Sequence, residues 1–200
     1  MDDGDQHHPQ PRRDDHQGIA RLFHWYKGMP SGTLTSVHEY RATSYRPDRE
    51  YVDGVLWERN SGERDHSELQ TELAAWLNVR RRRFGIHVFV EQRIQVSATR
   101  YRVPDICVTR GDRPTELVFT NPPFVCIEIL SKDDRDSDLR ERIEDYLRFG
   151  VSHCWVINPR SRRAWAHTRD GSMEVTDGVL RTDGPAIEVP LPEIFEELES

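Results

Sequence analysis

The chain has little of several features that common protein classes require. Its longest uninterrupted apolar stretches are about four residues, such as 124–127, whereas a membrane span needs roughly 18 or more, so none is expected. Residues 1–18 lack the apolar core of a secretory signal. Three cysteines cannot form a fully paired disulfide framework, which indicates a reducing compartment. We therefore expect a cytoplasmic protein with no membrane partner.

Lysine is scarce, and negative charge is concentrated at one end of the chain. Only Lys27 and Lys132 are lysines, and every other strongly basic residue is arginine. Of the 35 acidic and 28 basic residues, nine acidic residues and one basic residue lie in 170–200, which leaves 26 and 27 in the first 169 residues. The net charge of −7 therefore argues against tight, sequence-independent binding of nucleic acid. It does not argue against a body that contacts DNA on one face.

Composition divides the chain into three parts. Residues 1–18 are polar and almost without aliphatic side chains, so we expect a disordered tail. Residues 19–32 are expected to form a lead-in segment. Residues 33–200 have the length and the apolar pattern of one folded domain.

The pattern of the folded part is that of a mixed α/β domain. Tyr51–Trp57 surrounds an Asp-Gly pair, which predicts a hairpin. Phe124–Leu130 is apolar on both faces and predicts a central strand. Apolar residues at helical spacing predict a helix over 136–149. The other expected elements are a helix that Asp65 caps and that ends in the arginines of 80–83, strand structure within 86–96, one strand across 101–109, a strand at 153–157, additional C-terminal strands within 163–189, and a short acidic helix at the end.

Two carboxylates lie within apolar strand sequences. Glu128 interrupts Phe-Val-Cys-Ile-x-Ile-Leu, and Asp105 follows Pro104 in Val-Pro-Asp-Ile-Cys-Val. Burying an unpaired, ionised carboxylate costs several kcal/mol, so each group must be protonated, paired or bound to a metal. On neighbouring strands the two can share Mg²⁺, or Mn²⁺ in its place, which would activate water for phosphodiester hydrolysis. A buried ion pair with Arg102 or Arg142 is the alternative, and spacing alone leaves both open.

Several short motifs follow one another in a characteristic order. They are Asp53-Gly54, His66, Pro104-Asp105, Glu128-Ile129-Leu130-Ser131, and Tyr146…Gly150-Val151…Trp155-Val156-Ile157-Asn158-Pro159. In this order they resemble the Uma-two family of restriction endonucleases, within the PD-(D/E)XK nuclease superfamily. The resemblance covers about residues 33–197. It implies a restriction-endonuclease-like mixed sheet flanked by helices, with the metal ion held by Asp105, Glu128 and the main-chain carbonyl of Ile129.

The chain departs from this superfamily at its lysine. The usual position, two residues after the glutamate, holds Leu130. In relatives a lysine comes instead from the following helix, four residues before the tyrosine, and here that position is Arg142. Arginine stays protonated and cannot act as a base, but it can neutralise charge on the reacting phosphate and orient the attacking water. Lys132 is the other candidate for this role.

Two further residues have a functional and a structural interpretation. His66, at a helix start, either reaches the metal-bound water or a phosphate, or only caps and packs. Asp53 either supports the site or only forms the hairpin turn. The predicted catalytic set is Asp105, Glu128, Arg142, Lys132, His66 and Asp53.

These residues lead to one principal hypothesis, a Mg²⁺-dependent DNA endonuclease that hydrolyses phosphodiester bonds with a metal-activated water. The alternative is a catalytically weakened or inactive DNA-binding or scaffold module of the same fold, which the arginine at position 142 motivates. A third interpretation is an acidic protein-interaction domain. The expected partners are DNA and a second copy of the chain, because such nucleases often cut both strands as pairs.

Overall fold

The apolar run around Glu128 forms the central strand of a six-stranded sheet. The computed structural model describes residues 34–58 and 63–198. In it, all five residues of β7 (Val125–Ile129) are buried. β7 pairs in parallel with β8 (His153–Asn158) and antiparallel with β6 (Ile106–Arg110). The strand order is β10-β9-β8-β7-β6-β3, and the outer strands are β3 (Ile86–Val90), β9 (Arg163–Thr168) and β10 (Gly171–Glu174). The prediction of a central strand is confirmed.

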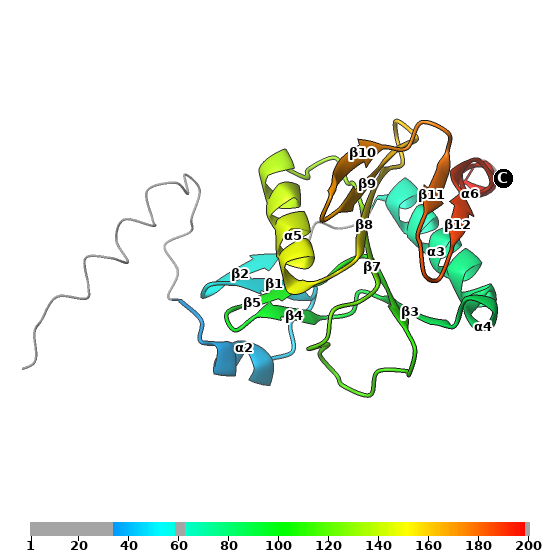
Figure 1. The fold of residues 1–200 in the computed structure, drawn as a ribbon. Coiled ribbons are helices and arrows are strands. Elements are labelled where there is room, and N and C mark those ends of the chain that lie inside the picture. Colours follow the sequence, from blue (N-terminus) through cyan, green and yellow to red (C-terminus); the bar gives the residue numbers. More distant parts are fainter. Residues whose placement is uncertain (1–33, 59–62, 199–200) are drawn as a thin grey trace, which may run out of the picture. The chain divides into compact units, whose positions relative to one another are not determined.

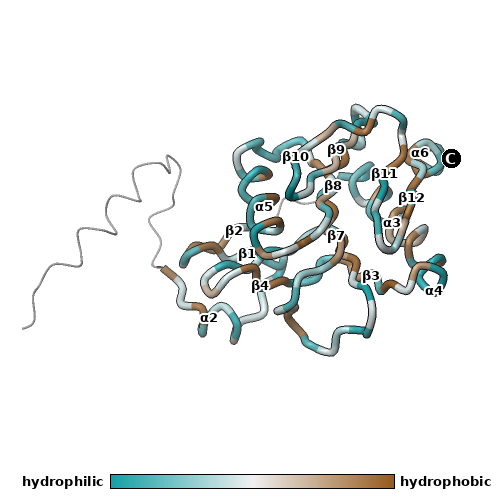
Figure 2. Tube along the Cα trace, in the orientation of Figure 1, coloured by the Kyte–Doolittle hydropathy of each residue, from teal (hydrophilic) through white to brown (hydrophobic). Residues whose placement is uncertain are grey.

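Helices cover both faces of this sheet (Figure 1). Leu69, Leu73 and Leu77 of α3 (Arg64–Val79) share one core with Ile127. Ile143 and Tyr146 of α5 (Asp136–Phe149) share another core with Cys126, and α5 has the predicted bounds. Apolar residues line the central strands β7 and β8 between these helices (Figure 2). Because side chains alternate along a strand, β7 directs Ile127 toward α3 and Glu128 toward α5.

A second, four-stranded sheet begins with the predicted hairpin. β1 (Arg49–Val52) pairs with β2 (Val55–Glu58), and both turn residues, Asp53 and Gly54, have positive φ. The order is β2-β1-β5-β4, with β4 (Ile94–Ser97) and β5 (Arg100–Arg102). The sequence analysis did not anticipate the helix α2 (Val37–Ala42). Three buried tyrosines that pack together join it to this sheet: Tyr40, Tyr51 and Tyr101.

The prediction of one strand across 101–109 is wrong. β5 ends at Arg102, β6 begins at Ile106, and the two strands belong to different sheets. Pro104 lies in the break, where its missing N–H and fixed φ interrupt strand pairing. The break places Asp105 at the junction of the two sheets, directly before β6.

The prediction that Asp65 caps the helix after the hairpin is also wrong. α3 starts at Arg64, two residues earlier than such a cap implies, and its N-cap is Glu63, whose side chain makes no capping hydrogen bond. Asp65 instead accepts hydrogen bonds from Arg64. After α3, the short helix α4 (Arg81–Phe84) ends at Gly85, whose φ of +64° suits a residue without a Cβ.

The C-terminal strands and helix cover the α3 face of the large sheet. β11 (Val179–Arg181) pairs with β12 (Glu188–Pro190), and α6 (Leu191–Glu197) follows directly. Leu180, Val189 and Phe195 join the core that contains α3. The predicted α/β fold with additional C-terminal strands is therefore confirmed.

Thr35–Ser200 forms one compact unit. The predicted tail at 1–18 and lead-in at 19–32 lie outside the described residues. Within the described part of the chain, no helix is long and apolar enough to cross a membrane.

Candidate active site

The structure brings the two predicted carboxylates together at one end of the central strands. Asp105 and Glu128 are 3% and 4% exposed. Oδ2 of Asp105 accepts a hydrogen bond of 2.7 Å from the main-chain N–H of Ile129, the residue that follows Glu128. The negative charge of Asp105 also raises the pKa of Glu128. Asp105, directly before β6, and Glu128, on β7, therefore share one buried site.

Glu128 lies between a phenol and a guanidinium of α5. The hydroxyl of Tyr146 donates to Oε1 at 2.7 Å, and Nη1 of Arg142 is 3.4 Å from Oε2. Burial is the largest influence and, with Asp105, raises the pKa of Glu128 to about 7, although Arg142 and Tyr146 act in the opposite direction. One arginine thus does not offset the cost of burying this charge beside a second carboxylate.

The raised pKa of Glu128 predicts how stability depends on pH when metal is removed. The pKa of Glu128 is about 7 in the folded state, above its ordinary value of 4.5. The folded protein therefore keeps this proton to a higher pH than the unfolded chain does. Its contribution is therefore complete below about pH 4.5 and is lost as the pH rises through 7. In a chelating buffer, we expect the free energy of unfolding to fall by up to about 3 kcal/mol across this window.

Urea denaturation at a series of pH values measures this loss, with Glu128→Gln as the comparison because it cannot titrate. The difference between the two unfolding free energies is expected to change across the window. Parallel profiles for the two proteins would show that Glu128 titrates normally.

The first turns of α3 supply two more side chains at Asp105. Nε2 of His66 is 3.3 Å from Oδ2 of Asp105, and its side chain is only 12% exposed. Nε2 of Gln70 donates to the main-chain carbonyl of Asp105 at 3.0 Å. The two residues are four apart and share one helix face. Sequence reasoning missed Gln70, for which the spacing of four residues from His66 is only a weak signal.

Arg142 occupies the place where the family resemblance expects a lysine, and it contacts the site. Besides Glu128, it donates from Nη2 to Asp134 at 3.3 Å. Its buried Nε has no hydrogen-bond partner among the described residues. Of the two arginines weighed as ion-pair partners, Arg142 contacts Glu128, whereas Arg102 contacts Glu50 and Asp145.

Lys132 and Asp53 lie outside this immediate group. Nζ of Lys132 is 2.7 Å from Glu63, and the lysine side chain is 59% exposed. Asp53 forms the hairpin turn and accepts hydrogen bonds from Thr99 and Arg100. The structure therefore gathers Asp105, Glu128, His66 and Arg142, and it places the other two predicted residues in ion pairs of their own.

The donor set fits a hard divalent cation bound by few protein ligands. No group of three His, Cys, Asp or Glu side chains within the described ranges could hold a metal. Two carboxylates remain, Asp105 and Glu128, with the main-chain carbonyl of Ile129 in the same segment. Magnesium commonly binds through one or two carboxylates and retains several waters. A cation there would also offset the burial and the charge of Asp105, which together raise the pKa of Glu128.

Comparison with known proteins assigns the chain to a family. The Uma2 family model, described as "Putative restriction endonuclease", matches residues 37–198. The chain belongs to this family. The resemblance seen in the motifs is thereby confirmed, and membership of this family supports a nuclease function.

Among solved structures, this Uma2 chain is similar to a protein from Anabaena variabilis described as a "putative nuclease belonging to DUF820". The TM-score is 0.72 at 21% identity, covering 84% of this chain and 99% of that one. At this identity the likeness shows the fold alone. No curated protein matches the chain.

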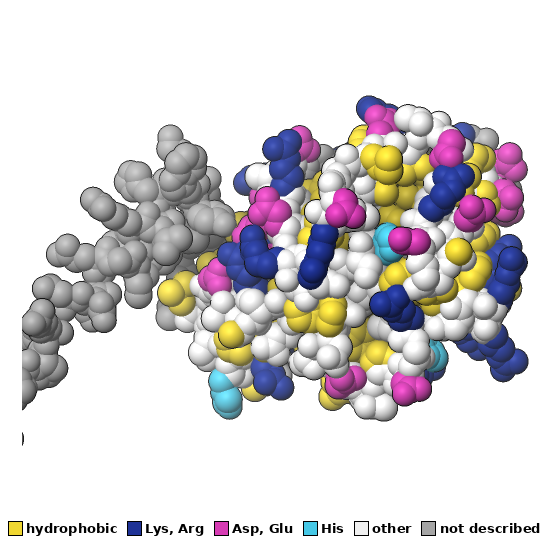
Figure 3. Space-filling model, viewed as in Figure 1, with side chains coloured by type: hydrophobic (Ala, Val, Ile, Leu, Met, Phe, Trp, Pro, Cys, Tyr) yellow, Lys and Arg dark blue, Asp and Glu magenta, His cyan; other side chains and the backbone are white. Residues whose placement is uncertain are grey.

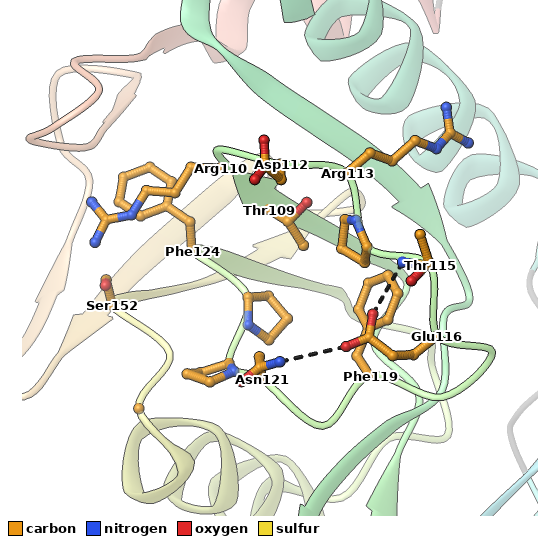
Figure 4. A pocket seen from close by; sticks show the side chains of 14 residues that line it. Thr109, Arg110, Asp112, Arg113, Thr115, Glu116, Phe119, Asn121, Phe124 and Ser152 are labelled. Atoms are coloured by element: carbon orange, nitrogen blue, oxygen red, sulfur yellow. Dashed lines mark hydrogen bonds between the residues drawn. The ribbon is translucent and has the colours of Figure 1, made fainter.

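This Uma2 chain also has a cavity of about 490 Å³, and Figure 4 shows the side chains that line it. Thr109 and Arg110, at the end of β6, and Phe124, just before β7, contribute to its lining. Asp105 precedes β6 and Glu128 lies near the end of β7. The cavity and the candidate site are therefore at opposite ends of these antiparallel strands.

Charges are mixed on the face of the Uma2 chain shown in Figure 3, where Lys and Arg side chains lie among Asp and Glu. The prediction that the helix after the hairpin ends in the arginines of 80–83 is wrong in its bounds: α3 ends at Val79 with Arg80 as its C-cap, and Arg81–Arg83 belong to α4. The Arg80 guanidinium lies 4.0 Å from the Trp76 ring centroid, and Arg81 donates to the carbonyl of Asn78. These cations complement the negative end of the helix dipole.

Proposed function

We propose that this chain is a Mg²⁺-dependent endonuclease that hydrolyses phosphodiester bonds in DNA. The observation that carries the proposal is the pair of buried carboxylates, Asp105 and Glu128, linked through the N–H of Ile129. The raised pKa of Glu128 supports it, because burial and the neighbouring charge of Asp105 both disfavour the ionised carboxylate, and a bound cation would offset both effects. Membership of the Uma2 family supports the reaction class.

The proposal gives each gathered residue a role. Asp105, Glu128 and the carbonyl of Ile129 would hold Mg²⁺, or Mn²⁺ in its place. When bound, the ion supplies Lewis acidity toward the phosphate and lowers the pKa of water. Arg142 would stabilise the charge that develops on the phosphoryl oxygens, because its guanidinium remains protonated.

His66 would orient the attacking water or carry its proton. Its Nε2 atom lies 3.3 Å from the carboxylate of Asp105, so the ring has a fixed anchor at the site. The exposed Lys132 takes no direct part in this arrangement, because its ammonium group is 2.7 Å from Glu63.

Incubation with supercoiled plasmid is the direct experiment. We expect nicked or linear products with Mg²⁺ or Mn²⁺ and none with EDTA, because two negative carboxylates repel a phosphate unless a cation is bound between them. Asp105→Ala, purified in parallel, controls for contaminating nucleases. Equal cleavage by both proteins, or cleavage in EDTA, would refute the proposal.

The contact between Arg142 and Glu128 favours a second candidate, a catalytically weakened or inactive DNA-binding or scaffold module of the same fold. There the guanidinium would replace the metal as the counter-charge. Calorimetric titration with Mg²⁺ separates the two candidates. Heat that disappears in Glu128→Gln supports the nuclease, and DNA binding without any Mg²⁺ heat supports the inactive module.

We also propose DNA as the partner and a homodimer as the assembly, since two copies can cut both strands. Sedimentation of the protein with and without a DNA duplex tests both. A monomer that leaves DNA free would contradict them. The cytoplasmic location stays a prediction.

A further inference from the structure

A buried ionic network lies beside the candidate site, and its central members are paired with one another. Glu50, Arg102 and Asp145 are each no more than 5% exposed. Nη1 of Arg102 donates to Glu50 at 2.8 Å. Nε of Arg102 donates to Asp145 at 2.9 Å, and Nη2 is 2.7 Å from the same oxygen. One guanidinium thus bridges carboxylates from β1 and α5.

One arm of this bridge leads to Asp105. The second oxygen of Glu50 accepts a hydrogen bond of 3.1 Å from the main-chain N–H of Val103. Val103 is the residue between Arg102 and Pro104, in the break between the two sheets. Glu50 therefore fixes the backbone just before Asp105, where no strand pairing holds it.

The other arm leads to the groups around Glu128. Asp145 directly precedes Tyr146 and follows Arg142 by three residues on α5. Those two neighbours are the side chains that contact the carboxylate of Glu128. Fixing Asp145 therefore fixes the rotation and height of α5 at the position where it meets the site.

Stability alone does not account for such a network. Replacing a buried ion pair by well-packed apolar side chains is often neutral or stabilising. A planar guanidinium, however, fixes both the direction and the separation of the two carboxylates that it bridges. The outer members extend the same network, since Arg100 joins Asp145 to Asp53 of the hairpin.

We propose that Arg102 is a positioning residue, which sets the separation between Asp105 and the α5 groups at Glu128. This rests on the proposed nuclease function. The outer layer of a metal site commonly contributes about 10- to 100-fold to metal affinity or activity. We expect losses of that size when the bridge is broken.

Arg102→Lys is the first variant, because an ammonium group keeps the charge but cannot bridge both carboxylates with the same geometry. Glu50→Gln is the second and milder one, and it decides the matter if the lysine variant does not fold. Arg163→Lys is the matched control. Arg163 donates to both oxygens of Glu174, at 2.7 Å each, in an exposed ion pair of the β9–β10 hairpin.

The measurements are the Mg²⁺ affinity by calorimetry and the single-turnover cleavage rate across Mg²⁺ concentrations, both well below the melting temperature. We expect Arg102→Lys and Glu50→Gln to weaken Mg²⁺ binding and to lower the rate at saturating Mg²⁺, each by about 10- to 100-fold. Arg163→Lys is expected to match the natural chain. A purely structural role would lower the melting temperature and leave both quantities unchanged.

The outcomes separate this proposal from the function on which it rests. If the natural chain binds Mg²⁺ and cleaves, and the folded variants match it, the role of Arg102 is refuted and the nuclease stands. If the natural chain shows neither Mg²⁺ heat nor cleavage, the proposed function fails and the positioning role fails with it.

Discussion

Replacing Asp105 by asparagine is expected to abolish Mg²⁺-dependent cleavage while the fold persists. The asparagine oxygen can still accept the hydrogen bond from Ile129, but the charged metal ligand is gone. A metal ion supplies several kcal/mol of transition-state stabilisation, and about 1.4 kcal/mol corresponds to a tenfold change in rate. We therefore expect the single-turnover rate to fall by about 10³-fold or more, with the calorimetric Mg²⁺ heat lost as well.

Asp112→Asn is the matched control for this variant. Asp112 is an exposed acid on the loop after β6, at the opposite end of that strand from Asp105. The Asp112→Asn variant is expected to cleave DNA at the rate of the natural chain. Retention of Mg²⁺ heat in Asp105→Asn would mean that the cation binds elsewhere, and the proposed site would then be wrong.

Replacing Arg142 by glutamine is expected to separate metal binding from catalysis. The rate should fall by about 10²- to 10³-fold, the usual cost of removing a group that stabilises developing charge. Mg²⁺ binding should persist or become tighter, because a cation 3.4 Å from Glu128 no longer competes with the metal. Arg142 also lowers the pKa of Glu128, so calorimetry belongs at a pH well above 7, where Glu128 is ionised without its help.

Two variants on the same helix complete this experiment. Arg142→Lys keeps a cation at the position and should retain most of the cleavage. Arg140→Gln removes an exposed arginine of α5 and should cleave normally. A glutamine variant at position 142 that cleaves like the natural chain would exclude Arg142 from catalysis. Loss of Mg²⁺ heat in that variant would make Arg142 a structural support for Glu128.

Much of the fold could be predicted because its elements carry strong local patterns. The bounds of α5 follow from apolar spacing and from the glycine that ends the helix, and β7 follows from a strand that is apolar on both faces. The strand proposed across 101–109 failed for a tertiary reason. Its two halves pair with strands of different sheets, and the sequence on either side of Pro104 is equally suited to strand formation.

The candidate site was predictable only in part. Asp105 and Glu128 stand out because a carboxylate in an apolar strand needs a compensating partner. Gln70 gave a weaker signal, because a glutamine on a helix is common on any polar face. The role of Glu50 could not be read, since its partners Arg102 and Val103 are about fifty residues away along the chain.

The amino-acid order alone determined the elements, the central strand and the two acids that such a strand cannot bury without compensation. Only the tertiary structure decided which cation faces which acid. It placed Arg142 beside Glu128, Lys132 beside Glu63, and Arg102 between β1 and α5. Local patterns depend on neighbours within a few residues, whereas an ion pair forms between whichever charges the packing of distant segments brings together.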